Sequence, residues 1–88
     1  MTDTSMGAVV RVLEAVRSEL VYATSTYAPI ASLHEGKAVI EEELEEAWQE
    51  IKRRPGELNK IRVRRELIQT AAMAVRTIVD CLGVVDDD

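Results

Sequence analysis

The feature that most limits the possible folds of this chain is a helical apolar period in three segments separated by two prolines. Segments 6–27, 33–54 and 58–82 carry apolar side chains three and four residues apart, the spacing of one helix face. Pro29 and Pro55 separate them, and a residue that precedes proline avoids helical backbone. We therefore predict an all-α fold with three helices, in a single domain over residues 1–88.

The ends of the second and third segments carry recognisable signals. Ser32 and Glu35 have the spacing of a capping box, in which the serine accepts from the first turn of a helix and the glutamate reaches back. Pro55-Gly56 predicts a turn, and Gly83 predicts the C-terminal end of the third helix. Asp86, Asp87 and Asp88 are expected to form a solvated tail.

The third segment is apolar over a wider arc than a surface helix needs. A helix over 58–82 would be ~36 Å long at 1.5 Å per residue, whereas the radius of gyration of a globular domain of this size is only ~12 Å. A second copy of the chain would supply the missing cover, and twofold dimers are the commonest closed assembly. An elongated three-helix monomer is the alternative. The apolar positions are Ile61, Leu67, Ile68, Ala71, Ala72, Ala74, Val75, Ile78, Val79 and Leu82.

Composition excludes several classes of function. The net charge is −5, which argues against a general nucleic-acid binder because such proteins neutralise phosphates with Lys and Arg. Cys81 is the only cysteine, so no internal disulfide forms and a cytoplasmic location is expected. No apolar run approaches the ~20 residues of a membrane span, and the first residues lack a signal-peptide pattern.

Acidic residues are concentrated in the second predicted helix. Each pair of like charges four residues apart destabilises a helix by a few tenths of a kcal/mol. The cluster is therefore unfavourable unless a cation or a basic side chain offsets the repulsion. Five of these acids share one side of the helix: Glu35, Glu42, Glu43, Glu46 and Glu50. The alternative is an ordinary solvated acidic face.

The third predicted helix offers a matching polar face. It carries Arg62, Glu66, Gln69, Met73, Arg76 and Asp80. If the two helices pack antiparallel, Glu42, Glu43 and Glu46 meet Glu66 and Gln69. Clustered carboxylates supply the hard oxygen ligands that Mg²⁺ prefers, with water and substrate phosphate completing the octahedron.

These motifs resemble those of MazG-type nucleoside triphosphate pyrophosphohydrolases and the related all-α dUTPases, which carry E-E-x-x-E on one helix and E-x-x-D on the next. This chain has Glu42-Glu43-Leu44-Glu45-Glu46, then Glu66-Leu67-Ile68-Gln69. The stretches 34–40 and 69–76 also resemble a small bacterial and phage subgroup of MazG-like proteins, and the likeness covers roughly residues 34–82. The departure is Gln69, where the family pattern has Asp.

The resemblance implies a metal-dependent hydrolase. By it, Glu42, Glu43, Glu46 and Glu66 hold Mg²⁺, with Mn²⁺ as the alternative ion, and Glu43 and Glu46 are the catalytic residues. Such enzymes use water to cleave a nucleoside triphosphate into the monophosphate and pyrophosphate. The family builds a four-helix core from intertwined homodimers, sometimes paired into tetramers. Because Gln69 lacks a charge, the alternative is a non-catalytic, oligomeric module that binds a nucleotide or a protein.

Several side chains of the third helix are candidates for substrate contacts. Gln69, Arg62 and Arg76 lie on the face of Glu66, and the two arginines could hold substrate phosphates. The structural alternative is that basic residues between 52 and 65 favour the C-terminal dipole of the preceding helix or pair with acids of a neighbouring subunit.

Overall fold

The three predicted helices are present in the computed structural model, which describes residues 5–53 and 55–83. The elements are α1 (Ser5–Thr26), α2 (Leu33–Ile51) and α3 (Glu57–Thr77), which continues into a π-helical turn, η1 (Ile78–Leu82). The prediction that α2 extends to residue 54 is wrong, because the helix ends at Ile51. Expectations for residues 1–4, Arg54 and the aspartate tail at 86–88 lie outside the described residues.

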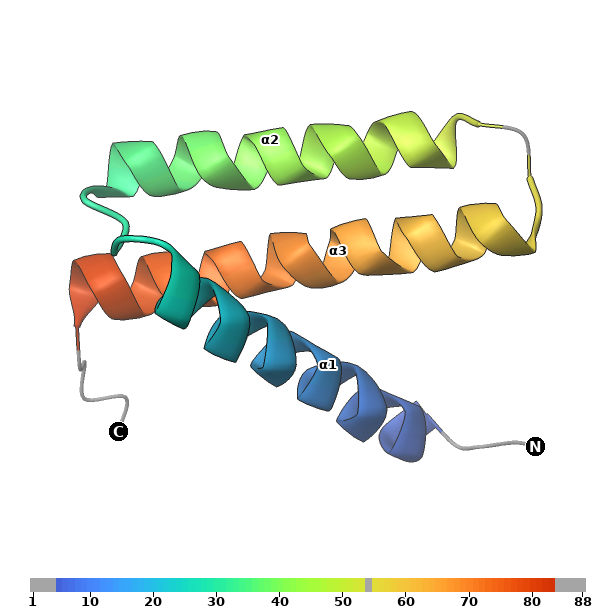
Figure 1. Cartoon of the computed structure of the whole chain (residues 1–88), viewed down its shortest axis with the longest axis horizontal. Coiled ribbons are helices and arrows are strands. Elements are labelled where there is room, and N and C mark those ends of the chain that lie inside the picture. Colours follow the sequence, from blue (N-terminus) through green and yellow to red (C-terminus); the bar gives the residue numbers. More distant parts are fainter. Residues whose placement is uncertain (1–4, 54, 84–88) are drawn as a thin grey trace.

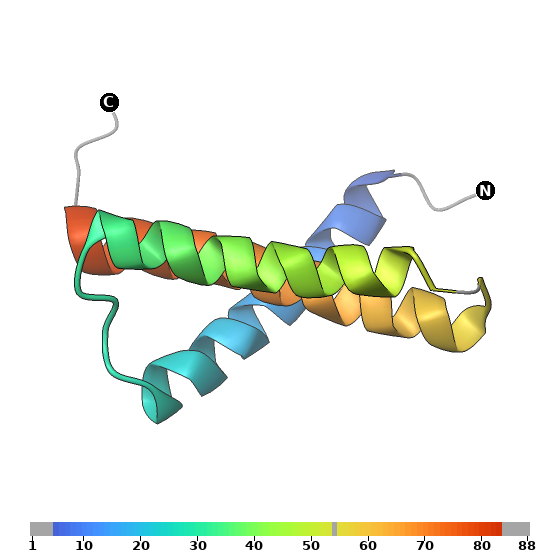
Figure 2. The ribbon, with the colours of Figure 1, turned by 90° about the horizontal axis from the view of Figure 1, so that it is seen from above.

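Helices α2 and α3 lie side by side and antiparallel, and α1 crosses α3 obliquely (Figures 1 and 2). The molecule measures 38 × 29 × 23 Å and its radius of gyration is 14.6 Å. A globular domain of this length has a radius of gyration of ~12 Å. The single chain is therefore more open than its length requires.

The ends of α2 explain its bounds. The Ser32 hydroxyl accepts from the Glu35 N–H at 3.1 Å, which confirms Ser32 as the predicted cap. A Glu35 carboxylate oxygen accepts from the Ala31 N–H at 2.6 Å, one residue before the N-cap residue that a capping box would use. At the other end, the Asn59 side chain of α3 donates to the Glu50 carbonyl, and the Arg53 N–H donates to the same carbonyl at 3.1 Å. These bonds satisfy a carbonyl that the helix leaves without an internal partner.

The core is thin and is built largely from small residues. Ala23, Ala47 and Ala72 are fully buried, and no large side chain is fully buried in the part of the chain that the structure describes. Gly36 of α2 lies directly against the Thr77 side chain of α3, with no room for a Cβ. Small residues at the contact let the two backbones approach closely, so the polar side chains that flank the contact are brought together.

Helix α3 buries residues of its polar face together with one small residue of its apolar stripe. The buried residues of the helix are Met73, Arg76, Thr77 and, from the stripe, Ala72. Large side chains of the apolar stripe remain about half exposed, with Leu67 at 45%, Ile78 at 54% and Leu82 at 51%. None of the described helices is long and apolar enough to cross a membrane.

We predict that Gly36→Ala lowers the free energy of unfolding. The added Cβ would overlap Thr77, and overpacking of this kind costs about 1–3 kcal/mol, although alanine is intrinsically the better helix former. Chemical denaturation would measure the change.

The control for this prediction is Gly56→Ala. A Cβ on Gly56 meets nothing within 4 Å, and the substitution at this N-cap should cost under about 1 kcal/mol. Equal effects at the two glycines would contradict the close packing of α2 on α3.

Candidate metal centre

Three carboxylates from two helices meet across the interface of α2 and α3. Glu43 and Glu46 lie one turn apart on α2, and Glu66 lies on α3. One carboxylate oxygen from each residue can be chosen so that all three lie within 4.8 Å of one another. The predicted pairing of the acidic helix with Glu66 is therefore confirmed for these three residues. The antiparallel packing produces it, because residues near the middle of both helices then lie opposite each other.

The electrostatics of this group favour protonation. Burial, followed by the charges of Glu46 and Glu66, raises the pKa of Glu43 from 4.5 to about 7. Burial and the Glu46 charge also raise the pKa of Glu66, while the Arg65 charge lowers it. Nearby carboxylates that lose water disfavour each other's charged form. Within the described residues, no cation offsets this repulsion enough to keep the pKa of Glu43 near its ordinary value.

Gln69 lies between Glu43 and Glu66. Its amide is assigned with Nε2 toward the acids, because that orientation lets it donate to Glu66 Oε1 at 3.2 Å and to Glu43 Oε2 at 3.0 Å. An aspartate at this position would be acceptor-only when ionised and would add a fourth charge. Gln69 instead supplies a neutral donor that partly offsets the repulsion, and rotation of its amide would present the oxygen as a ligand.

Two further acids of α2 lie next to this group. Glu42 is exposed and lies outside the set of three, although its charge contributes to the raised pKa of Glu43. Glu50 is half-buried and its charge raises the pKa of Glu66. Its buried Oε1 accepts no hydrogen bond from the described residues and pairs only with Arg53, at 3.5 Å.

The predicted ligand set did not include Glu50, but the sequence carried a signal for it. Glu43, Glu46 and Glu50 follow one another at spacings of three and four residues, which places them on one helix face.

The basic candidates differ in their availability. Arg62 is half-buried, whereas the Arg76 side chain is 8% exposed. A terminal nitrogen of Arg76 donates to the Ala28 carbonyl at 2.8 Å and lies 3.8 Å from Asp80 Oδ2. Arg76 therefore anchors the connector between α1 and α2 to α3, a role that its helical spacing did not reveal.

The donor set fits a hard divalent cation. Such ions take carboxylate oxygens together with water, and Glu43, Glu46 and Glu66 offer three carboxylates from two rigid helices. A cation at this position would stabilise the ionised carboxylates that now repel one another. Among the side chains that meet here, Gln69 is the neutral one, so the possible metal ligands are not all carboxylates.

Comparisons with protein-family models, with curated proteins and with solved structures found no match to this chain.

We predict that thermal stability falls as the pH rises from about 5 to about 8. The pKa of Glu43 is about 7 in the folded chain and 4.5 in the reference state. Between these values the unfolded chain loses its proton first, so the folded state binds more protons and the free energy of unfolding decreases with pH. Below 4.5 the stabilising contribution is complete, and above about 7 it is lost.

Melting temperatures of the wild type and of Glu43→Gln, measured across this range, would test the prediction. The variant cannot titrate at this position, so its profile should be flatter and its melting temperature at pH 8 higher. Glu45→Gln is the control, because Glu45 is exposed and bonded to Gln49. A Glu43→Gln profile that is parallel to that of the wild type would contradict the assignment.

Proposed function

We propose that this chain is a Mg²⁺-dependent nucleoside triphosphate pyrophosphohydrolase of the MazG-like type, acting in the cytoplasm. One observation supports the proposal above the others: two of the three carboxylates of the E-E-x-x-E motif, Glu43 and Glu46, meet Glu66 of the second motif within 4.8 Å. The two motifs are twenty residues apart in sequence, so their meeting does not follow from local structure.

The proposed roles follow from position. Glu43, Glu46 and Glu66 would hold Mg²⁺, with Mn²⁺ as the alternative. The predicted fourth ligand, Glu42, is less favoured, because it lies outside this set of three and lines a neighbouring cavity. When bound, the ion would neutralise charge on the triphosphate and lower the pKa of a bound water. Glu43 and Glu46 would orient the hydrolytic water, and one of the two carboxylates would accept its proton. Arg62 contacts substrate phosphates, and Gln69 turns its amide oxygen toward the centre. The predicted phosphate contact of Arg76 is less favoured, because its guanidinium is held by Ala28 and Asp80.

The first test is pyrophosphate release from a panel of nucleoside triphosphates with Mg²⁺ and then with Mn²⁺. We expect release from the wild type and a loss of about 100-fold or more in Glu43→Gln, since even the outer-shell partners of metal ligands cost 10–100-fold. Glu14→Gln removes the same charge from α1, where Glu14 is exposed, pairs with Arg17 and lies in none of the proposed contact surfaces, and it should retain activity. Equal activity in the two variants, or no release from any substrate, would refute the enzyme proposal.

A second candidate is a non-catalytic module that keeps the same fold and binds a nucleotide or a protein partner. The observation that favours it is the Gln69 amide, which donates to both Glu43 and Glu66. In this role the amide stabilises the centre without a metal. Mg²⁺ would then bind weakly, because it must displace an internal donor.

The substitution Gln69→Asp separates the two candidates. It replaces the donor with a fourth carboxylate, and calorimetry should show Mg²⁺ affinity raised by about 10-fold or more. Gln49→Asp is a matched control, since Gln49 is exposed and hydrogen-bonded to Glu45, away from the centre. A wild type that already turns over rapidly would eliminate the non-catalytic candidate.

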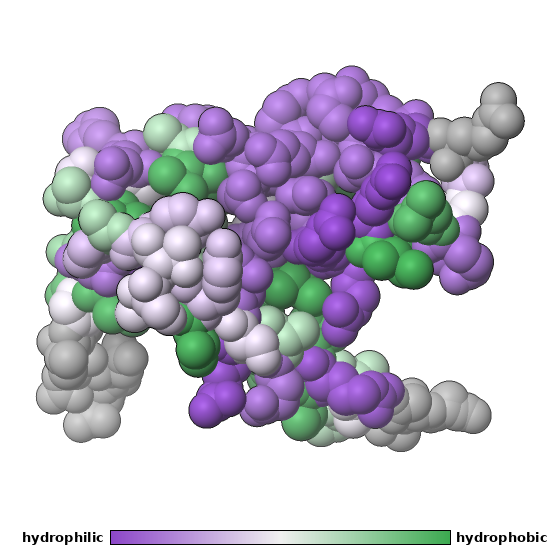
Figure 3. Space-filling view, in the orientation of Figure 1, coloured by the Kyte–Doolittle hydropathy of each residue, from purple (hydrophilic) through white to green (hydrophobic). Residues whose placement is uncertain are grey.

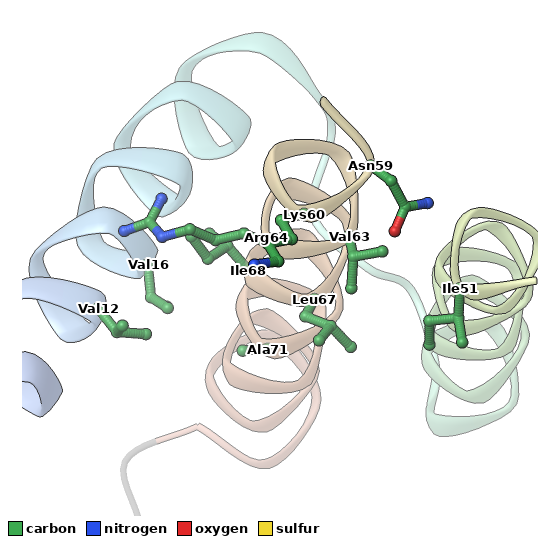
Figure 4. Close-up of a pocket in the computed structure, with 10 residues that line it drawn as sticks. All are labelled: Val12, Val16, Ile51, Asn59, Lys60, Val63, Arg64, Leu67, Ile68 and Ala71. Carbon is green, nitrogen blue, oxygen red and sulfur yellow. The ribbon is translucent and has the colours of Figure 1, made fainter. Parts of the chain in front are cut away.

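A homo-oligomer, in its simplest form a twofold dimer, is part of the proposal, and a tetramer would pair two dimers. An open groove of about 630 Å³ lies between α1, α3 and the end of α2. Figure 4 shows Val12 and Val16 of α1 across from Ile68, with Leu67 toward α2. Green apolar surface is also visible between α1 and α3 in Figure 3.

Charge complementarity supports a second copy as the partner at this groove. The outward face of α2 presents Leu44 and Trp48 at about half exposure, 51% and 49%, beside Glu41 and Glu45. The groove carries Lys60 and Arg64 among its lining residues. Docking the acidic, apolar face of α2 into this groove in both directions forms a closed twofold pair and completes a helical core.

Sedimentation equilibrium would test the assembly. We expect a mass of at least twice 9.8 kDa for the wild type and dissociation in Trp48→Lys, because a charge would enter the apolar contact. Leu58→Lys is the control, since Leu58 is 59% exposed and lines neither surface. A monomeric wild type at high concentration would refute this part of the proposal.

A further inference from the structure

A second concave feature lies beneath the connector between α1 and α2. Its volume is about 380 Å³, within the range of small-molecule sites. Pro29 and Ile30 of the connector, Val39 of α2 and Met73 of α3 form apolar walls. Tyr27, the first residue after α1, lies at its edge, 57% exposed. The connector, α2 and α3 therefore contribute to a cavity whose lining does not include Glu43, Glu46 or Glu66.

The connector is fixed to α3, so the cavity exists before any ligand binds. The Arg76 guanidinium donates to the Ala28 carbonyl at 2.8 Å. The Ile30 N–H donates to Asp80 Oδ2 at 2.9 Å. Together these bonds hold both ends of the short segment that covers the cavity. They also use the Arg76 guanidinium, which is the cation among the residues that line this space.

Apart from Tyr27, whose hydroxyl is hydrogen-bonded to Tyr22, the remaining polar side chains of the cavity are hydrogen-bond acceptors. Glu35 and Glu42 line it from α2, and an ionised carboxylate only accepts. One oxygen of Glu35 already accepts from the Ala31 N–H, which leaves the other for a ligand. Two carboxylates disfavour a phosphate here by like charge. They favour a flat apolar group that presents N–H donors at its edge.

The cavity also lies at a useful distance from the metal centre. Met73 follows Gln69 by four residues, about 6 Å along the axis of α3, and Glu42 is adjacent to Glu43. A sugar can bridge a separation of that order, with phosphates at the metal centre and a base in the cavity. The exposed Tyr27 ring, set edge-on to Tyr22 with ring centroids 6.1 Å apart, offers an aromatic surface at the mouth.

We propose that this cavity binds the heterocyclic base of a nucleotide and selects bases with an exocyclic amino group over those with an oxo group at the same position. The carboxylates of Glu35 and Glu42 accept from the amino group, and the apolar walls cover the ring. The inference rests on the proposed function for its substrate class, but base binding itself requires neither metal nor hydrolysis.

The test uses nucleosides without phosphate and the full chain without divalent ions. Cytidine with uridine, and adenosine with inosine, are pairs in which an amino group becomes an oxo group. Amide signals of Val39 and Met73 would be followed by NMR. At least one amino nucleoside should shift these signals and bind about 10-fold more tightly than its oxo partner, since an oxo group offers no donor to the two carboxylates and its lone pairs repel them.

Glu42→Ala and Glu41→Ala are the matched variants. They remove neighbouring, exposed carboxylates of α2. Unlike Glu42, Glu41 pairs with Lys37 at 2.9 Å and does not line the cavity. Glu42→Ala should remove the discrimination between amino and oxo nucleosides, and Glu41→Ala should keep it. Val39→Phe, which fills the cavity from the α2 side, should abolish nucleoside binding, with the melting temperature reporting whether the fold is kept.

The outcomes separate this inference from the proposed function. Selective nucleoside binding without pyrophosphate release would support the base site and refute the hydrolase. Pyrophosphate release without any nucleoside-induced shift, or equal affinity for amino and oxo nucleosides, would overturn the base site and leave the hydrolase standing.

Discussion

The close antiparallel contact between α2 and α3 positions every candidate site in this chain. Gly36 lies against Thr77, and Ala47, on the same face of α2, is fully buried. Large side chains at these positions would separate the helices and move Glu43 away from Glu66. Because the contact uses small residues, it contributes little apolar burial of its own, and its value lies in the distance that it sets between polar groups.

That short distance brings acids together at a cost in electrostatic free energy. Burial and neighbouring charges raise the pKa of Glu43 to about 7, so the folded chain favours a proton or a cation at this position. The Gln69 amide stabilises these carboxylates weakly, by donating to Glu43 and Glu66. A divalent ion would stabilise them more strongly. Whether the amide or an ion occupies this position distinguishes the proposed binding module from the proposed enzyme.

Small residues at the helix contacts also leave the single chain with a thin core. The fully buried residues are alanines, while Leu44, Leu67 and Ile78 remain about half exposed. Apolar surface on this scale in a small domain is typical of an interaction site. A second copy that covers the groove between α1 and α3 would add the burial that the small-residue contact lacks, without disturbing the spacing of the carboxylates.

Local patterns in the sequence determined the three helices, the Ser32 cap and the stop at Gly83, because periodicity and capping act over a few residues. On the condition that the two helices pack antiparallel, the sequence also predicted that Glu42, Glu43 and Glu46 would meet Glu66 and Gln69. The tertiary structure supplies that packing and brings Glu43 and Glu46 to Glu66. The tertiary structure alone decided that Arg76 anchors the connector, that Glu42 borders a cavity rather than joining the three carboxylates, and that Gln69 donates to two acids. These features depend on how each helix is rotated about its axis. That rotation is set by which small residues meet across the interface, and this is a non-local choice that periodicity does not encode.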